Sequence, residues 1–160
     1  MELDVEIEGW PATPDWAGVA ARAWSAATEV APELANPRLS ISILFTSDTE
    51  VQALNLEWRG KDKPTNVLSF PMLDRADLIT LPADGPPEML GDIALARETC
   101  TRESEEKGID VADHATHLIV HGLLHLAGHD HIGDAEAEAM EALETKALAS
   151  MGIADPYGND

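Results

Sequence analysis

The 160-residue sequence is poor in cysteine, in aromatic residues and in basic residues, and each scarcity excludes a class of protein. Cys100 is the only cysteine, which excludes an intrachain disulfide and a zinc site built from clustered cysteines. Aromatic residues make up 4% of the chain, so we expect a core of aliphatic side chains and alanine. No run approaches about 18 consecutive apolar residues, and the acidic N-terminus does not resemble a signal peptide. We therefore expect a single domain over residues 1–160, cytoplasmic and without a membrane partner.

Positive charge is also scarce, since 10 basic residues face 30 acidic ones and the formal net charge is −20. This balance argues against a broadly basic nucleic-acid-binding surface. The basic residues are nevertheless clustered, because Arg59, Lys61 and Lys63 fall within one short stretch and Arg75 follows in the next expected loop. Such a patch could hold a polyanion locally. On charge alone, a solvated loop that carries lysines is the simpler interpretation.

The pattern of apolar residues indicates the fold class. Alternation of apolar and polar residues predicts strands at 3–7, 39–45, 66–70 and 91–96. Helical periodicity and composition predict helices at 15–30, 48–58, 97–107, 110–127 and 133–150, with Ser47 and Glu50 as a capping box. Residues 72–90, rich in Asp and Pro, are expected to form a long loop without a regular element. The order predicts an α+β domain, a small mixed β-sheet packed against helices, with a histidine-bearing helix in the C-terminal half.

The most informative stretch runs from His121 to His131 and has the spacing H-x3-H-x2-G-x2-H. His121 and His125 are one helical turn apart, so both imidazoles project from the same face. Gly128 can then turn the backbone and bring His131 back toward that face. A catalytic zinc site typically has three protein ligands and one open coordination position. The spacing therefore predicts one zinc ion bound by His121, His125 and His131, although three imidazoles also suit nickel, copper or iron.

A straight three-histidine site on the helix is excluded by its geometry. His117, His121 and His125 share a face, but the helix rises about 12 Å from His117 to His125. Ligand nitrogens around one tetrahedral zinc lie only about 3.4 Å apart. A third ligand must therefore come from beyond a bend, which favours His131 over His117.

The other histidines of the cluster receive no ligand role. His114 and His117 are interpreted as residues of the helix face that make local hydrogen bonds, and His129 is expected to point elsewhere. Asp130 either orients a ligand imidazole or is an exposed turn residue.

Gly122 separates this motif from the metzincin metalloproteases, which have the same spacing but a glutamate at this position. That glutamate accepts the proton of the metal-bound water, and glycine cannot do so. Phosphodiester cleavage remains possible, because a metal and nearby cations can stabilise charge that develops on phosphorus. A metallopeptidase with a substitute base and a non-catalytic protein with a structural metal stay as alternatives, although structural zinc sites normally have four protein ligands.

The histidine motif closely resembles the signature of the YbeY family, the bacterial rRNA maturation endoribonucleases. Residues 54–71 are similar to a second signature of that family, 90–93 to a third, and the 136–157 tail also resembles it. The resemblance implies a single-strand-specific, metal-dependent endoribonuclease that acts on the 3′ end of small-subunit rRNA and in ribosome quality control. It implies single-stranded RNA and the small ribosomal subunit, or proteins associated with it, as partners. It also implies zinc at the three predicted ligands.

The resemblance further implies a functional role for Arg59, in catalysis or substrate binding. A guanidinium can hold a phosphate through two hydrogen bonds, and Lys61 and Lys63 would add to the local field. Arg59 is also favoured simply as a cation at the end of the predicted helix, and the two interpretations are compatible. Two positions depart from the family pattern, since His129 stands where tyrosine is frequent and Asn66 where aspartate is frequent.

Overall fold

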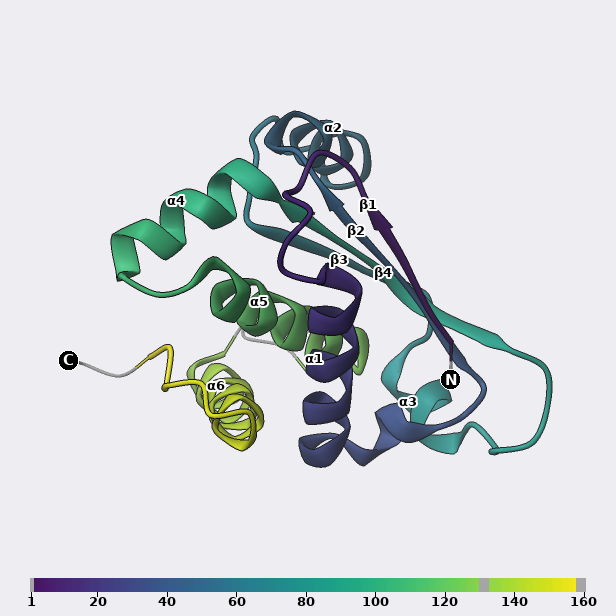
Figure 1. Ribbon diagram of the computed structural model, residues 1–160. Coiled ribbons are helices and arrows are strands. Elements are labelled where there is room, and N and C mark those ends of the chain that lie inside the picture. The colour runs from purple at the N-terminus through teal and green to yellow at the C-terminus, as the bar shows by residue number, and fades with distance from the viewer. Residues whose placement is uncertain (1, 130–132, 158–160) are drawn as a thin grey trace.

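A twisted four-stranded sheet forms the centre of the protein in a computed structural model that describes residues 2–129 and 133–157. Its strands are β1 (Glu2–Ile7), β2 (Leu39–Thr46), β3 (Val67–Pro71) and β4 (Glu88–Ala96). They lie in the order β1-β2-β4-β3, as Figure 1 shows. β1, β2 and β4 are parallel, whereas β3 pairs with β4 in the antiparallel sense. The predicted mixed sheet of an α+β fold is confirmed.

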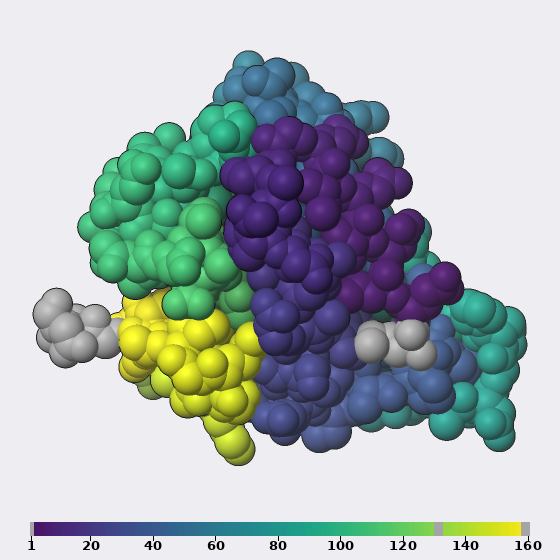
Figure 2. Space-filling view, in the orientation of Figure 1, coloured from purple at the N-terminus to yellow at the C-terminus, as the bar shows by residue number. Residues whose placement is uncertain are grey.

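The helices cover the two faces of this sheet unequally. Their bounds are α1 (Trp16–Val30), α2 (Asp48–Arg59), α3 (Arg75–Thr80), α4 (Arg97–Lys107), α5 (Val111–Leu126) and α6 (Asp134–Ser150), with a short 3₁₀ helix at Pro32–Ala35. α1 and α5 lie on one face with α6 packed outside them, whereas α2 lies on the other face (Figure 1). In the space-filling view, the N-terminal third of the chain lies against the α6 region (Figure 2). No helix in the described part of the chain is both long and apolar enough to cross a bilayer.

Strand alternation divides the core into two clusters. Ile93 and Leu95 of β4 belong to the large cluster with α1 and α5, together with Ile41, Ile43 and Phe45 of β2. Ala94 and Ala96, the intervening residues, pack instead with Leu68 and with Val51 of α2. Because successive side chains of a strand point to opposite faces, α2 and α5 lie on opposite sides of the sheet.

Gly91 lets the end of α5 approach the sheet closely. The pairing of β2 with β4 shifts register between Ser40 and Ile41, at the point where Gly91 enters the ladder. A Cβ at Gly91 would collide with the carbonyl oxygen of Phe70 and would lie 2.7 Å from Cδ2 of Leu126. The last turn of the histidine helix is therefore seated directly over β4.

The predicted elements are confirmed apart from one segment. Ser47 caps α2, because its hydroxyl accepts a hydrogen bond from the backbone N–H of Glu50 at 3.2 Å. The expectation that 72–90 holds no regular element is wrong, since this segment contains α3 and the start of β4. The side chain of Asp74 caps α3 by accepting a hydrogen bond from the N–H of Asp77 at 2.8 Å. The buried side chain of Leu78 packs the helix against the core.

Candidate metal centre

His121 and His125 lie side by side on α5, as their spacing predicts. Their ring centroids are 4.8 Å apart and the rings are nearly perpendicular. Both residues are half-buried and each borders a hollow. The His121 hollow, about 210 Å³, lies between α5 and α6, and the His125 hollow, about 360 Å³, is bordered by residues 71–75. The two imidazoles are thus held by a buried helix at accessible positions.

The chain leaves the helix at Gly128, as the sequence predicts. Gly128 has a φ of 95°, a conformation that L-residues with side chains resist. Its N–H donates to the carbonyl of His125 at 2.9 Å, and the N–H of His129 donates to that of Leu124 at 3.0 Å. These bonds satisfy the last carbonyls of α5 and turn the backbone. His131, the predicted third ligand, and Asp130 both lie outside the described residues.

The side chains present fit a transition-metal ion of the zinc type in their donor chemistry. Two imidazoles one helical turn apart are a recurrent pair of ligands for such ions, and a third donor must come from elsewhere in the chain. Among residues 2–129 and 133–157, no group of three or more His, Cys, Asp or Glu side chains is placed to hold a metal. His121 and His125 would therefore supply two ligands of a site whose third position is assigned by sequence to His131.

Glu144 is the charged group behind this pair. It lies on α6 with 0% of its surface exposed. One carboxylate oxygen, Oε1, accepts from Nε2 of His117 and from the Tyr157 hydroxyl, each at 2.8 Å, while Oε2 lies 3.2 Å from Nδ1 of His121. Burial alone would raise the pKa of Glu144, but the hydrogen bonds from His117 and His121 outweigh it and lower the pKa to about 2. A buried carboxylate therefore links two histidines of α5 to α6 and to the C-terminal segment.

Sequence reasoning gave no role to Glu144 or Tyr157. A signal for Glu144 existed, because it shares one buried helix face with Met140, Ala147 and Leu148, where an acidic residue needs a partner. Tyr157 had no comparable pattern, since it lies beyond the last helix. Its backbone N–H donates to Oδ1 of Asp155 at 2.8 Å, which orders the segment. Burial, together with its hydrogen bond to Glu144, raises the pKa of Tyr157.

His114 also pairs with a carboxylate, away from the candidate ligands. Its Nε2 lies 2.8 Å from Oε1 of Glu103 on α4, which also accepts from the amide of Asn66 at 3.0 Å. Burial lowers the pKa of His114 despite this partner. Burial would raise the pKa of Glu103, but the hydrogen bonds from His114 and Asn66 lower it overall. His114 and His117 thus both hydrogen-bond to nearby groups, as expected, although their partners lie on other elements.

His129 is turned toward the 3₁₀ helix. Its Nε2 lies 3.7 Å from Oε1 of Glu33. Burial and the neighbouring Arg75 lower the pKa of His129.

Gly122 faces the sheet. A Cβ added there would lie 3.0 Å from Cδ1 of Ile93, so glycine allows α5 to pack closely on β4. Position 122 therefore lacks a general base, and a longer side chain would have to enter the core.

Arg59 lies on a different helix from the histidine pair. It is the exposed last residue of α2, on the sheet face opposite α5, and is followed by Gly60 in a left-handed conformation. The adjoining basic turn is ordered by Asn55, whose amide donates to the carbonyl of Lys63 at 2.9 Å. Grouping Arg75 with this turn was wrong, because Arg75 lies in α3, 3.2 Å from Glu33.

A third hollow lies on the α2 side of the sheet and shares two lining residues with the hollow beside His125. It encloses about 570 Å³ between α2 and the sheet, and its lining includes Leu54, Trp58, Phe70 and Asp92. Pro71 and Met72, at the end of edge strand β3, border both this hollow and the one beside His125. Trp58, the residue before Arg59, is 66% exposed. The end of β3 thus borders both the hollow on the α2 side of the sheet and the hollow beside His125.

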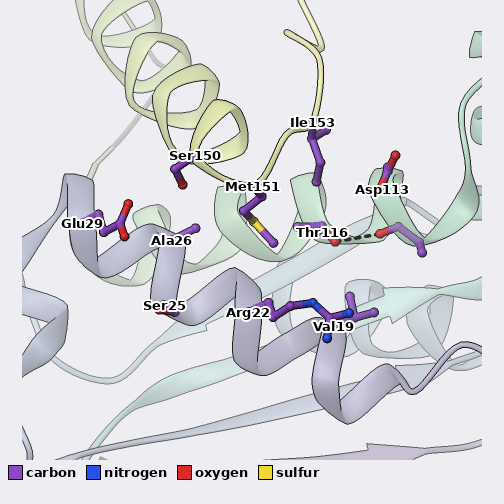
Figure 3. A pocket seen from close by; sticks show the side chains of 11 residues that line it. Val19, Arg22, Ser25, Ala26, Glu29, Asp113, Thr116, Ser150, Met151 and Ile153 are labelled. Atoms are coloured by element: carbon purple, nitrogen blue, oxygen red, sulfur yellow. Dashed lines mark hydrogen bonds between the residues drawn. The ribbon is translucent and has the colours of Figure 1, made fainter.

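Another hollow lies apart from these, between α1, the start of α5 and the end of α6 (Figure 3). Met151 is directed into it, and the hydroxyl of Thr116 bonds back to the carbonyl of Ala112 at 2.7 Å. Its described lining includes neither histidine nor cysteine, so it contributes nothing to the candidate centre.

Comparison with known proteins agrees with this architecture. Residues 13–152 match the family model described as Endoribonuclease YbeY. The chain is 64% identical to the Endoribonuclease YbeY of Erythrobacter litoralis, covering 99% of each chain. It is 59% identical to that of Novosphingobium aromaticivorans, covering 98% of this chain and 95% of the other. The solution structure of TM1509 from Thermotoga maritima matches with a TM-score of 0.58 at 20% identity, over 98% of this chain and 99% of that one, which shows the shared fold. The chain therefore belongs to the endoribonuclease YbeY family.

Proposed function

We propose that this protein is a metal-dependent endoribonuclease that cleaves single-stranded RNA, with one zinc ion held by His121, His125 and His131. The observation that carries the proposal is the histidine pair on α5, which lies between two hollows and directly before the turn at Gly128. The names of the relatives support RNA as the substrate. Zinc bound there would supply a Lewis acid and lower the pKa of a bound water.

The protein's own residues favour phosphodiester over peptide hydrolysis. Gly122 offers no carboxylate to carry a proton to a leaving amine, and its close contact with Ile93 leaves no room for one. Arg59 is exposed and directly follows Trp58, which lines the hollow on this side of the sheet, and a guanidinium can hold a phosphate through two hydrogen bonds. We therefore assign Arg59 to binding the RNA backbone at a distance from the metal, on a path around the end of β3.

In this proposal the substrate is ribosomal RNA, cleaved at the 3′ end of small-subunit rRNA during maturation and ribosome quality control. The formal net charge of −20 supports the involvement of a partner, because most of the surface repels a polyanion. The small ribosomal subunit, or a protein associated with it, would deliver the substrate to the local basic patch.

The test is cleavage of defined single-stranded RNA by the purified protein, with and without a chelator, beside casein as a peptidase substrate. We expect metal-dependent RNA cleavage that His121→Ala abolishes and Arg59→Ala weakens mainly through KM. Arg102→Ala removes an exposed cation on α4 and serves as the matched control, with activity unchanged. Intact RNA with every metal tried, or cleavage of casein instead, would contradict the proposal.

A further inference from the structure

We propose that Glu144 is a positioning residue that fixes the imidazole of His121 in the tautomer that presents Nε2 to the metal. The inference deepens the proposed function and rests on it, because it takes His121 as a ligand. Its basis is the set of contacts that Glu144 makes with α5 and with the C-terminal segment.

The contact between Glu144 and His121 defines the tautomer. Oε2 of Glu144 lies 3.2 Å from Nδ1 of His121, and a carboxylate oxygen only accepts hydrogen bonds. Nδ1 of His121 therefore carries the hydrogen, and in the neutral ring the lone pair is on Nε2. A carboxylate behind a ligating imidazole sets ring orientation in this way and increases the basicity of the ligand.

The carboxylate cannot easily rotate away from this role. Oε1 accepts from both His117 and Tyr157 at 2.8 Å, so turning Oε2 away from His121 would break or distort those bonds as well. The residue is fully buried on α6, which packs directly against α5. His121 is thus oriented by a group that is itself held from two other elements.

These same contacts distinguish a positioning role from direct ligation. Both oxygens of Glu144 are engaged by side-chain donors, and the described residues contain no group of three ligands that includes it. Glu144 therefore acts through His121.

The chain contains a matched control for this arrangement. Glu103, which is partly exposed, accepts from Nε2 of His114 at 2.8 Å, so a second carboxylate is paired with another histidine of α5. His114 lies about two helical turns before His121 and borders neither histidine hollow. Replacing Glu103 by glutamine changes a similar pair without touching the candidate ligands.

The experiment compares Glu144→Gln and Glu103→Gln with the unaltered chain. Zinc affinity is measured by competition with a chromophoric chelator, and the His121 tautomer is measured by ¹⁵N NMR in the metal-free protein. We expect Glu144→Gln to weaken zinc binding roughly 10- to 100-fold and to give a mixture of His121 tautomers. Glu103→Gln should leave zinc affinity within about threefold, a shift far smaller than the range expected for losing the outer partner of a ligand.

The outcomes separate the inference from the proposed function. The inference would be overturned if the unaltered chain binds zinc, Glu144→Gln binds it equally tightly, and His121 in the variant is still protonated at Nδ1. Failure of the unaltered chain to bind zinc would overturn the proposed function, while the tautomer measurement would still decide whether Glu144 controls His121. Tyr157→Phe removes one donor and keeps the carboxylate. It provides a milder variant, with a smaller loss of affinity expected, if Glu144→Gln does not fold.

Discussion

The guanidinium of Arg75 on α3 donates a hydrogen bond of 2.6 Å to the carbonyl of Ala127, at the end of the histidine helix. The same Nη1 lies 3.2 Å from Glu33, so the side chain joins three segments. Its stem also occupies the space beside Gly128, where a Cβ would lie 2.6 Å from Cβ of Arg75. The turn that leads toward the predicted third ligand is therefore fixed by a residue far away in the sequence.

Replacing Arg75 by alanine should loosen this turn. We expect the free energy of unfolding to fall by about 1–2 kcal/mol, the cost of losing a charge-assisted hydrogen bond at a partly exposed site. Zinc affinity should fall as well, because the turn at Gly128, which precedes the predicted third ligand in the sequence, loses its support. Denaturant unfolding and chelator competition measure the two effects.

Arg38→Ala is the control for this change. Arg38 also donates to backbone carbonyls, those of Pro82 and Pro86, but it ties a different loop to the start of β2. It should lower stability while leaving zinc affinity unchanged. Equal loss of zinc affinity in both variants would show that Arg75 has no specific role at the turn.

Restoring the glutamate of the peptidase motif at position 122 should damage the fold without creating a protease. Gly122 is buried against Ile93, so Gly122→Glu forces a carboxylate into the apolar contact between α5 and β4. We expect a loss of stability of roughly 3 kcal/mol or more, from overpacking and from burying an unpaired charge. Thermal unfolding and a casein assay test this, with Gly122→Ala as the smaller change. A stable Gly122→Glu variant that cleaves casein would contradict our view of this position.

Acidification should destabilise the protein in two stages through His114 and Glu103. The folded state lowers the pKa of His114 below 6.5, so below that pH the unfolded chain binds a proton that the native protein resists. The pKa of Glu103 is lowered from 4.5, and its contribution to stability is lost as pH falls through that lower range. Stability should therefore fall first below about pH 6.5 and again below about pH 4.5.

The first stage can be assigned with one variant. His114→Gln should be less stable than the unaltered chain at pH 8, because Glu103 loses its partner on α5. It should also show a shallower loss of unfolding free energy between pH 7 and pH 5.5, measured by urea titration at each pH. An unchanged slope would assign the first stage to another group, such as His129, whose pKa burial also lowers.

Local patterns predicted the elements well, and the exceptions have physical reasons. The alternation in β2 and the cap at Ser47 are properties of neighbouring residues, which a sequence displays directly. α3 was missed because it has only six residues, and its stability comes from Arg75 and Leu78 contacting distant segments.

In the candidate site, too, the sequence predicts the local features and misses those that depend on packing. The adjacency of His121 and His125 follows from helical spacing alone. The contacts of Glu144 depend on how α6 packs against α5, which no local pattern specifies. The place of Arg59 also depends on packing, since α2 carries its basic turn on the sheet face away from the histidines.

This separation leads to a prediction for Trp58, which lines the hollow on the Arg59 side of the sheet. Aromatic side chains stack on the unpaired bases of single-stranded RNA, and each such contact contributes about 1–3 kcal/mol to binding. Under the proposed function, Trp58→Ala should weaken single-stranded RNA binding roughly 5- to 150-fold, the same energy expressed as an affinity ratio. Zinc affinity should not change, because the tryptophan and the histidines lie on opposite faces. Ile109→Ala, which trims an exposed apolar side chain between α4 and α5, should change neither quantity. Loss of zinc binding in Trp58→Ala would mean that the two faces are coupled through β3, and unchanged RNA affinity would place the bound strand elsewhere.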